Sequence, residues 1–356
     1  MVASIGTFAQ NEILRRRSQE AQLELNTLQT QVSSGRKADT FSGLGEGARY
    51  SLNLRQSKQS TEAFISTNRT TDIRMQQMQA TLERIKDIAN GVKISAFAGV
   101  SSASTPAAQG NFTIRTTSRG AIAEISQLLN SQIDGFYLFA GRRTDAPPMI
   151  DPGGIGETGT PLGNAAALAA TLPLANDQTS GDALYDGIVT HLDGGTVGGV
   201  AGADPVRYYD GEHSADGGSL LVARIDANTD IAYGTTGRDD SVAKIMQALY
   251  ALSVAELTPT SEAGYRQVAL RAVADLEAGF NGIVEEIGDL GVKQTQLEDV
   301  TTRQQDFITT LDLQLGAIED VDMSEALSKL SAAQTQLEAS YRMIALMREL
   351  SITKYL

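Results

Sequence analysis

The distribution of proline and glycine constrains the fold of this chain more than any other feature. All eight prolines lie within residues 106–259, and 19 of the 34 glycines lie within residues 135–237. Proline breaks a helix and glycine destabilises it, so long helices are permitted on both sides of this central part but not inside it. The sequence therefore predicts two long helical flanks around a central segment of different character.

Apolar residues in the flanks recur in alternating steps of three and four, the spacing of a coiled-coil seam. In the first helix Gly35 stands as a C-terminal glycine, and such a seam runs through Leu14, Ser18, Ala21, Leu25, Leu28 and Val32. In the last helix Asp322 is the expected N-cap, with Glu325 three residues later. The expected helices cover residues from about 4 or 7 to 33, 46–104, 114–134, a short stretch after Asp239, and most of the chain from about 260.

The central segment reads as a small β-rich domain. Strand-like runs at 206–210, 219–226 and 229–234 are separated by turns rich in Gly and Asp. The expected fold class is α+β: an elongated antiparallel helical coiled-coil or bundle formed by both chain ends, with a β-rich inserted head. The expected domains are an inner domain (1–45 plus 318–356), a rod (46–144 plus 240–317) and an acidic outer domain (145–239).

Charge is divided unevenly along the chain, whose formal net charge is −14. Residues 1–144 hold 17 basic and 11 acidic side chains, residues 145–240 hold 3 and 15, and residues 259–356 hold 8 and 16. A chain this acidic is repelled by phosphate, so nucleic acid is not an expected partner. The opposite charge of the first and last thirds favours pairing of the two ends.

Three features could carry chemistry, and each has a plainer interpretation. "GIGETG" (154–159) has the G-x-G-x-x-G spacing, but the sequence predicts no strand before it and no helix after it, so a turn is expected. The only histidines are His191 and His213, and the second lies in the acidic loop "DGEHSADGG" (210–218), which lacks the full spacing of a calcium loop. We therefore expect no catalytic residue, no cofactor and no metal site.

Composition sets further limits. The chain has no cysteine, which excludes disulfides and thiolate metal ligands. No apolar run approaches the roughly 18 residues of a membrane span, so membrane insertion is not expected. The start has no pattern of a cleaved signal peptide, so any export is expected to use another route.

Four stretches together resemble the flagellin superfamily. "SSGRKADTFSG" (33–43) resembles the turn that ends the first flagellin helix, and "AIEDVDMSEALSKLSAAQTQLEASY" (317–341) is similar to the C-terminal flagellin signature. "DGFYLFAGRRTDAPP" (134–148) and the ending "LSITKYL" resemble the hook–filament junction proteins, the third hook-associated proteins. The resemblance covers roughly 1–145 and 240–356, and it departs from the family pattern at "DTFSGLGEGA" (39–48).

The resemblance implies a structural adaptor of the bacterial flagellum that joins the hook to the flagellin filament. It implies an extracellular subunit, exported through the flagellar type III channel without a cleaved signal. The implied partners are other copies of the chain in a ring or helical lattice, the hook-side junction protein, flagellin, and an export chaperone on the C-terminal helix. It implies no enzymatic activity.

Two groups of residues are expected to carry this role. The assembly interface is expected to form where the terminal helices pair, through Leu14, Leu25, Leu28, Val32, Leu327, Leu330, Leu337, Tyr341 and Ile344. The junction between rod and head is expected at Phe136, Tyr137, Leu138, Phe139 and Gly141, with the four apolar side chains closing the top of the helical rod.

Three alternatives stay open at this point. A filament flagellin is the nearest, because it shares the same terminal seams. A carbohydrate-binding or hydrolytic surface protein would place its activity in the acidic head, which has no recognisable acid–base pair. A cytoplasmic coiled-coil scaffold would keep both ends ordered in the monomer, whereas an exported subunit should lose both ends quickly to protease.

Overall fold

The computed structural model describes residues 2–101, 107–157, 159–193, 208–210, 220–258 and 260–350. The chain forms two compact units, Met1–Ala63 with Arg303–Leu356, and Phe64–Thr302. The division falls within two long helices, α2 (Gly47–Ser101) and α7 (Glu262–Glu319). The predicted fold class, a mainly helical fold formed by both chain ends with a small β component, is confirmed.

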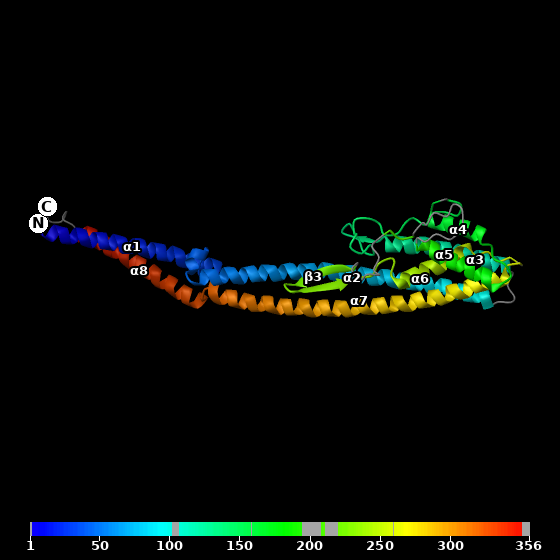
Figure 1. Cartoon of the computed structure of the whole chain (residues 1–356). Helices are drawn as coiled ribbons and strands as arrows, with labels where there is room; N and C mark the ends of the chain where they lie inside the picture. The colour runs from blue at the N-terminus through cyan, green and yellow to red at the C-terminus, as the bar shows by residue number, and fades with distance from the viewer. Residues whose placement is uncertain are drawn as a thin grey trace. The chain divides into compact units, whose positions relative to one another are not determined.

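The first unit holds the two ends of the chain. Helix α1 (Val2–Ser34) lies beside α8 (Met323–Leu350) (Figure 1). The pair is antiparallel, because Gln22 donates a hydrogen bond to the Tyr341 hydroxyl while the Val321 N–H donates to the Gly35 carbonyl. A short 3-10 helix, η1 (Phe41–Leu44), links α1 to α2. A small apolar cluster then joins the start of α2 to the end of α7 through Leu54, Leu311 and Leu315.

The second unit has one large apolar core, formed mainly by α2, α3 (Ala107–Leu129), α6 (Asp240–Val254) and α7. Ile245 and Leu249 of α6 are fully buried, as are Met78 and Leu82 of α2. The glycines of α7 do not interrupt the helix. A methyl group built on Gly279 would lie 2.6 Å from Cγ1 of Ile245, so the absent side chain is what lets α6 pack this closely.

Helix α3 ends at Leu129, earlier than the predicted residue 134. The reason is the next turn: Asp134 and Gly135 both have positive φ, at 53° and 81°. Two consecutive residues in this region form the tight turn of a β-hairpin. The hairpin pairs β1 (Gln132–Ile133) with β2 (Phe136–Tyr137).

The segment 145–239 contains more helix than the sequence indicated. Helices α4 (Pro161–Thr171) and α5 (Gln178–Leu192) were not predicted, and α4 follows "GIGETG" directly, with Thr160 as its N-cap. The antiparallel pair β3 (Leu221–Asp226) and β4 (Thr229–Tyr233) agrees with two predicted strands. Of the third, 206–210, only 208–210 are described, and they contribute an isolated bridge between Tyr209 and Met149.

Candidate functional site: the paired chain ends

The seam between α1 and α8 is built from small side chains flanked by larger ones. Ser18, Ala21 and Leu28 are buried on α1, and Ala326 and Ala333 are buried on α8. These positions continue the heptad steps of the sequence, and alanine and serine allow two helix backbones to approach closely. Ser18 and Ala21 lie on the seam predicted for the first helix. On α8 the sequence pattern predicted Leu327 and Leu330 but not Ala326 and Ala333, although the seven-residue spacing of the two alanines was a visible signal.

The predicted interface residues fall into two groups. Leu28 is buried, and Leu25, Val32, Leu330, Leu337 and Ile344 are partly buried. Leu327 and Tyr341 remain 49% and 47% exposed, and the side chain of Leu14 lies outside the described residues. Pairing within one chain thus uses only part of the predicted seam, and its role in assembly stays a prediction.

A group of hydrogen-bonded polar side chains lies near the ends of α1 and α7 and the start of α8. We call this group, Ser51, Arg55 and Glu319, the clasp. Glu319, the last residue of α7, accepts hydrogen bonds from the Ser51 hydroxyl and from Arg55, both on α2. The Arg55 Nε lies 2.8 Å from Glu319 Oε1, and its second nitrogen reaches Oε2. The hydrogen bonds from Arg55 are the main reason why the pKa of Glu319 falls from 4.5 to about 2, with Ser51 and the charge of Arg36 adding to the effect. The glutamate is therefore held ionised, mainly by the Arg55 guanidinium.

Backbone contacts tie the turn after α1 to the same place. The Lys37 N–H donates to the Glu319 carbonyl at 2.6 Å, and the Val321 N–H donates to the Gly35 carbonyl at 3.0 Å. The Lys37 ammonium lies 2.8 Å from the Ala317 carbonyl, one of the carbonyls left unpaired by the end of a helix. Gly35 has a φ of +72°, a conformation that favours glycine. These contacts bring "SSGRK" (33–37) and "AIED" (317–320) together in the fold.

The start of α8 is capped as the sequence predicted. One carboxylate oxygen of Asp322 accepts from the N–H groups of Ser324 at 2.8 Å and Glu325 at 3.1 Å. The cap satisfies two N–H groups that have no partner inside the helix. The clasp and this cap together fix the place where one long helix ends and the next begins.

The predicted junction residues do not act as one cluster. Leu138 and Phe139 are buried in the core, whereas Phe136 is 47% exposed and Tyr137 is partly buried. The Phe139 carbonyl accepts hydrogen bonds from the Tyr209 hydroxyl and the Gly237 N–H, both at 3.0 Å. Gly141 is buried with a φ of +66°, as expected for a turn. Whether these residues close the top of a rod stays a prediction.

The most perturbed carboxyl in the second unit belongs to Glu286 of α7. Burial raises its pKa to about 7, with the nearby charge of Asp239 contributing and a hydrogen bond from Ser241 opposing the rise. Ser241 is in the first turn of α6, so this bond fastens the start of α6 to α7. The contact is of the kind that holds helices together, and no reaction is assigned to it.

The two histidines and the acidic loop around His213 were the other groups considered from the sequence. His191 is fully buried on α5, and burial lowers its pKa. His213 and the loop 211–218 lie outside the described residues, within which no cluster of His, Asp and Glu could hold a metal ion. The described helices include none long and apolar enough to cross a membrane.

The part of the chain that contains Glu319 and α8 is similar to a known protein family. Residues 273–356 match the family model of the bacterial flagellin C-terminal helical region, and this range includes most of α7, the clasp residue Glu319 and all of α8. The fold is similar to a solved structure described as a putative flagellar hook-associated protein from Vibrio parahaemolyticus, with a TM-score of 0.50 and 13% sequence identity. That match covers 77% of this chain and 97% of the other. No curated protein matches at the sequence level.

The resemblance to flagellins is thus confirmed in the C-terminal region. Residues 273–356 are similar to the C-terminal helical region of bacterial flagellins, and the fold is similar to that of the Vibrio protein. The family model includes Leu327, Leu330, Leu337 and Tyr341.

Proposed function

We propose that this chain is a structural subunit of the bacterial flagellum, and specifically an adaptor that joins the hook to the flagellin filament. One observation carries the proposal: the flagellin-type C-terminal helix α8 pairs with α1 in a single unit. A subunit whose two ends form one helical pair can present a single composite surface to its neighbours. The role is structural and includes no enzymatic step.

Exposed apolar side chains on the paired ends support assembly with other copies. Leu327, Tyr341 and Leu346 of α8 and Leu23 of α1 are all between 47% and 68% exposed. Burying one such side chain contributes about 1.5–3 kcal/mol, so a few of them can hold a lattice together. In this proposal the predicted assembly interface therefore acts between copies as well as within one.

The proposal includes the partners and location that the sequence suggested. The chain forms a ring or short helical lattice outside the cell, with the hook-side junction protein below it and flagellin above it. A chaperone covers the C-terminal helix before export. The inner domain (1–45 plus 318–356) forms the lattice, the rod (46–144 plus 240–317) supports it, and 145–239 is the outer domain.

The experiment that tests the proposal is electron microscopy of the purified chain mixed with isolated hooks. Thin caps confined to one end of the hooks are expected, with no assembly in a sample without hooks. Long filaments in both samples would identify a filament flagellin instead, which is the second candidate because the same C-terminal region is flagellin-type. Absence of any association would contradict both.

A further inference from the structure

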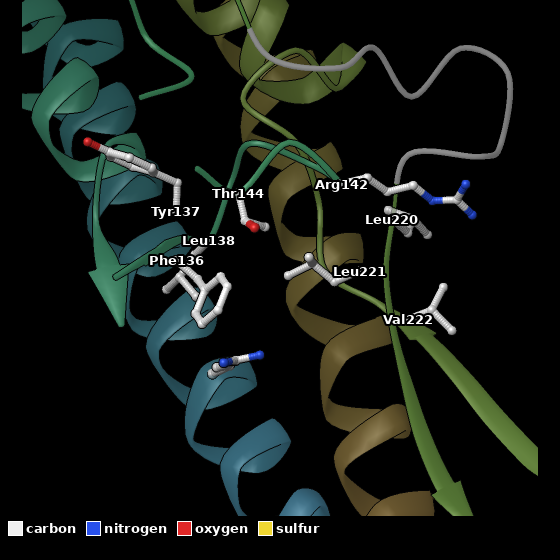
Figure 2. Close-up of a pocket in the computed structure, with 9 residues that line it drawn as sticks. Phe136, Tyr137, Leu138, Arg142, Thr144, Leu220, Leu221 and Val222 are labelled. Atoms are coloured by element: carbon white, nitrogen blue, oxygen red, sulfur yellow. The ribbon is translucent and has the colours of Figure 1, made fainter. Parts of the chain in front are cut away.

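The second unit contains a cavity. It has a volume of about 440 Å³, and β2, β3 and the turn after β2 all contribute to it. Phe136 and Leu221 point into it from the two hairpins, while the ring of Tyr137 turns away (Figure 2). Its lining consists of Arg74, Phe136, Tyr137, Leu138, Arg142, Thr144, Leu220, Leu221 and Val222.

The charge of this cavity is opposite to that of the chain. Two arginines line it, and the described lining includes no carboxylate, although the chain as a whole carries a net charge of −14. Within the described residues neither Arg74 nor Arg142 has an ion-pair partner, whereas the adjacent Arg143 lies 3.5 Å from the Asp210 carboxylate. Among the described residues around the cavity, these two arginines are therefore positive charges without a carboxylate partner.

The two arginines sit in different surroundings. The guanidinium of Arg74 lies 5.1 Å from the centre of the Phe136 ring, a cation–π contact that holds the charge against the cavity wall. Arg142 is exposed and lies beside Leu220 at the other side (Figure 2). Between them lie Phe136, Leu221 and Val222, the last of which is 54% exposed. An apolar floor between two cations suits a segment that carries both acidic and apolar side chains.

The backbone around the cavity suits an extended segment. Leu221 and Val222 are the first two residues of β3, and in the described sheet β3 has a strand neighbour, β4, on one side only. A segment lying in the cavity can continue along a strand edge and form main-chain hydrogen bonds there.

We propose that this cavity is a docking site for an extended, acidic segment from residues 145–240 of a second copy of this chain. Carboxylates of that segment bind Arg74 and Arg142, and an apolar side chain between them packs on Phe136 and Leu221. Charge complementarity selects the occupant, since residues 145–240 contain 15 acidic and 3 basic side chains. The inference rests on the proposed function, because a lattice is what brings such copies together.

The test uses the full chain, which has no native cysteine, so that a single introduced one is unique. Val222→Cys is labelled with benzophenone maleimide and irradiated, once in concentrated solution and once after mixing with hooks. The expected product is a crosslinked dimer whose second chain is joined within 145–240. Leu270→Cys, labelled in the same way, is the control, because Leu270 is 47% exposed and does not line the cavity.

Charge reversal at Arg142, compared with a control reversal elsewhere, tests whether this arginine binds the segment. Arg142→Glu, in the Val222→Cys background, should lower the dimer yield by about tenfold, since like charges facing each other across an interface are strongly unfavourable. Arg266→Glu makes the same change at an exposed position of α7 that does not line the cavity and has no ion-pair partner among the described residues, and it should alter the yield by less than about twofold. Both side chains are exposed, so neither change threatens the core.

The outcomes separate the two proposals. A dimer yield no higher than with Leu270→Cys in either sample, a crosslink within one chain, or one to residues outside 145–240 would overturn the docking site. Caps on hooks without the dimer would leave the proposed function standing. The mapped dimer in solution without any hook binding would support the docking site and count against the hook adaptor.

Discussion

Arg55 of α2 and Glu319 at the end of α7 form a two-point ion pair, with Arg55 Nε 2.8 Å from Glu319 Oε1. The Glu319 side chain is 10% exposed and the Arg55 side chain is 41% exposed, so solvent screens the arginine but hardly reaches the carboxylate. Together with the Lys37 contacts, this pair fixes the end of α7 against the turn that follows α1. The clasp is thus the structural basis of the paired ends on which the proposed assembly depends.

Glu319→Ala should lower the free energy of unfolding of the first unit. The variant leaves the Ser51 hydroxyl and Arg55 without their acceptor, and after allowance for the exposed arginine we expect a loss of about 1–2 kcal/mol. Urea denaturation followed by circular dichroism measures it. Glu325→Ala is the control: its pair with Lys329 is an exposed (i, i+4) pair on α8, so this change should lower the free energy of unfolding far less. Equal losses for the two variants would contradict a special role for the clasp.

The carboxyl of Glu286 should make the free energy of unfolding depend on pH. Its pKa is raised from 4.5 to about 7, so the folded state binds its proton more tightly than the unfolded state does. The free energy of unfolding should therefore fall as pH rises from about 4.5 to 7, and the loss is complete above pH 7. Glu286→Gln keeps the hydrogen bond to Ser241 and removes the buried charge. It should be more stable than the wild type at pH 8, by on the order of 1–3 kcal/mol, and show no such advantage at pH 4.

Thermal unfolding between pH 4 and 8 measures the effect of Glu286→Gln. Glu285→Gln removes a charge at the adjacent, exposed position and controls for the simple loss of negative charge on α7. A stability advantage of Glu286→Gln that is the same at every pH would show that the buried carboxyl is not the cause.

Two glycines of α7 should respond in opposite directions to the same change. In Gly279→Ala the new methyl group would lie 2.6 Å from both Ile245 Cγ1 and the Ser241 carbonyl, and overpacking of this kind costs about 1–3 kcal/mol. Gly288 has nothing within 4 Å, so Gly288→Ala should stabilise the helix by about 0.5–1 kcal/mol. Thermal melts of the two variants decide the matter, and stabilisation by both would show that α6 and α7 are not in close contact at Gly279.

Leu337→Asp should block assembly. Leu337 is partly buried in the seam between α1 and α8, where an aspartate would have to give up its hydration without a partner. Incorporation at hook ends, counted by electron microscopy, should fall to background. Gln336→Asp, an equally acidic change at the adjacent exposed position, should incorporate normally. Normal incorporation of Leu337→Asp would show that the seam is wrongly assigned.

The sequence predicted the helices well because their signals are local. The absence of proline before residue 106, the heptad steps of α1 and the Asp322 cap each act within a few turns, and each agrees with the structure. It missed α4 and α5 because the Gly-rich, Pro-rich composition around them favours turns, whereas their stability comes from burying Leu168 and Ile188 in the core. Propensity is a weak guide where tertiary packing decides.

The contacts between the end of α7 and the start of α8, which are the clasp and the Asp322 cap, could be predicted only in part. Asp322 was recognised because a cap depends on residues three apart, but the partners Ser51 and Glu319 are 268 residues apart in the chain. Nothing in the local pattern of either residue signals that contact. The exposure of Leu327 and Tyr341 was likewise invisible to a periodicity argument, which gives an apolar stripe but not the neighbour that covers it.

Growth of flagellin on isolated hooks decides whether this chain adapts the hook to the filament. Hooks stripped of other junction proteins are incubated with flagellin monomers and the hook-side junction protein, with and without this chain, and filament lengths are measured by electron microscopy. Filaments are expected at hook ends only when the chain is present, and none are expected with Leu337→Asp. Equal growth with and without the chain, or no growth in its presence, would contradict this role.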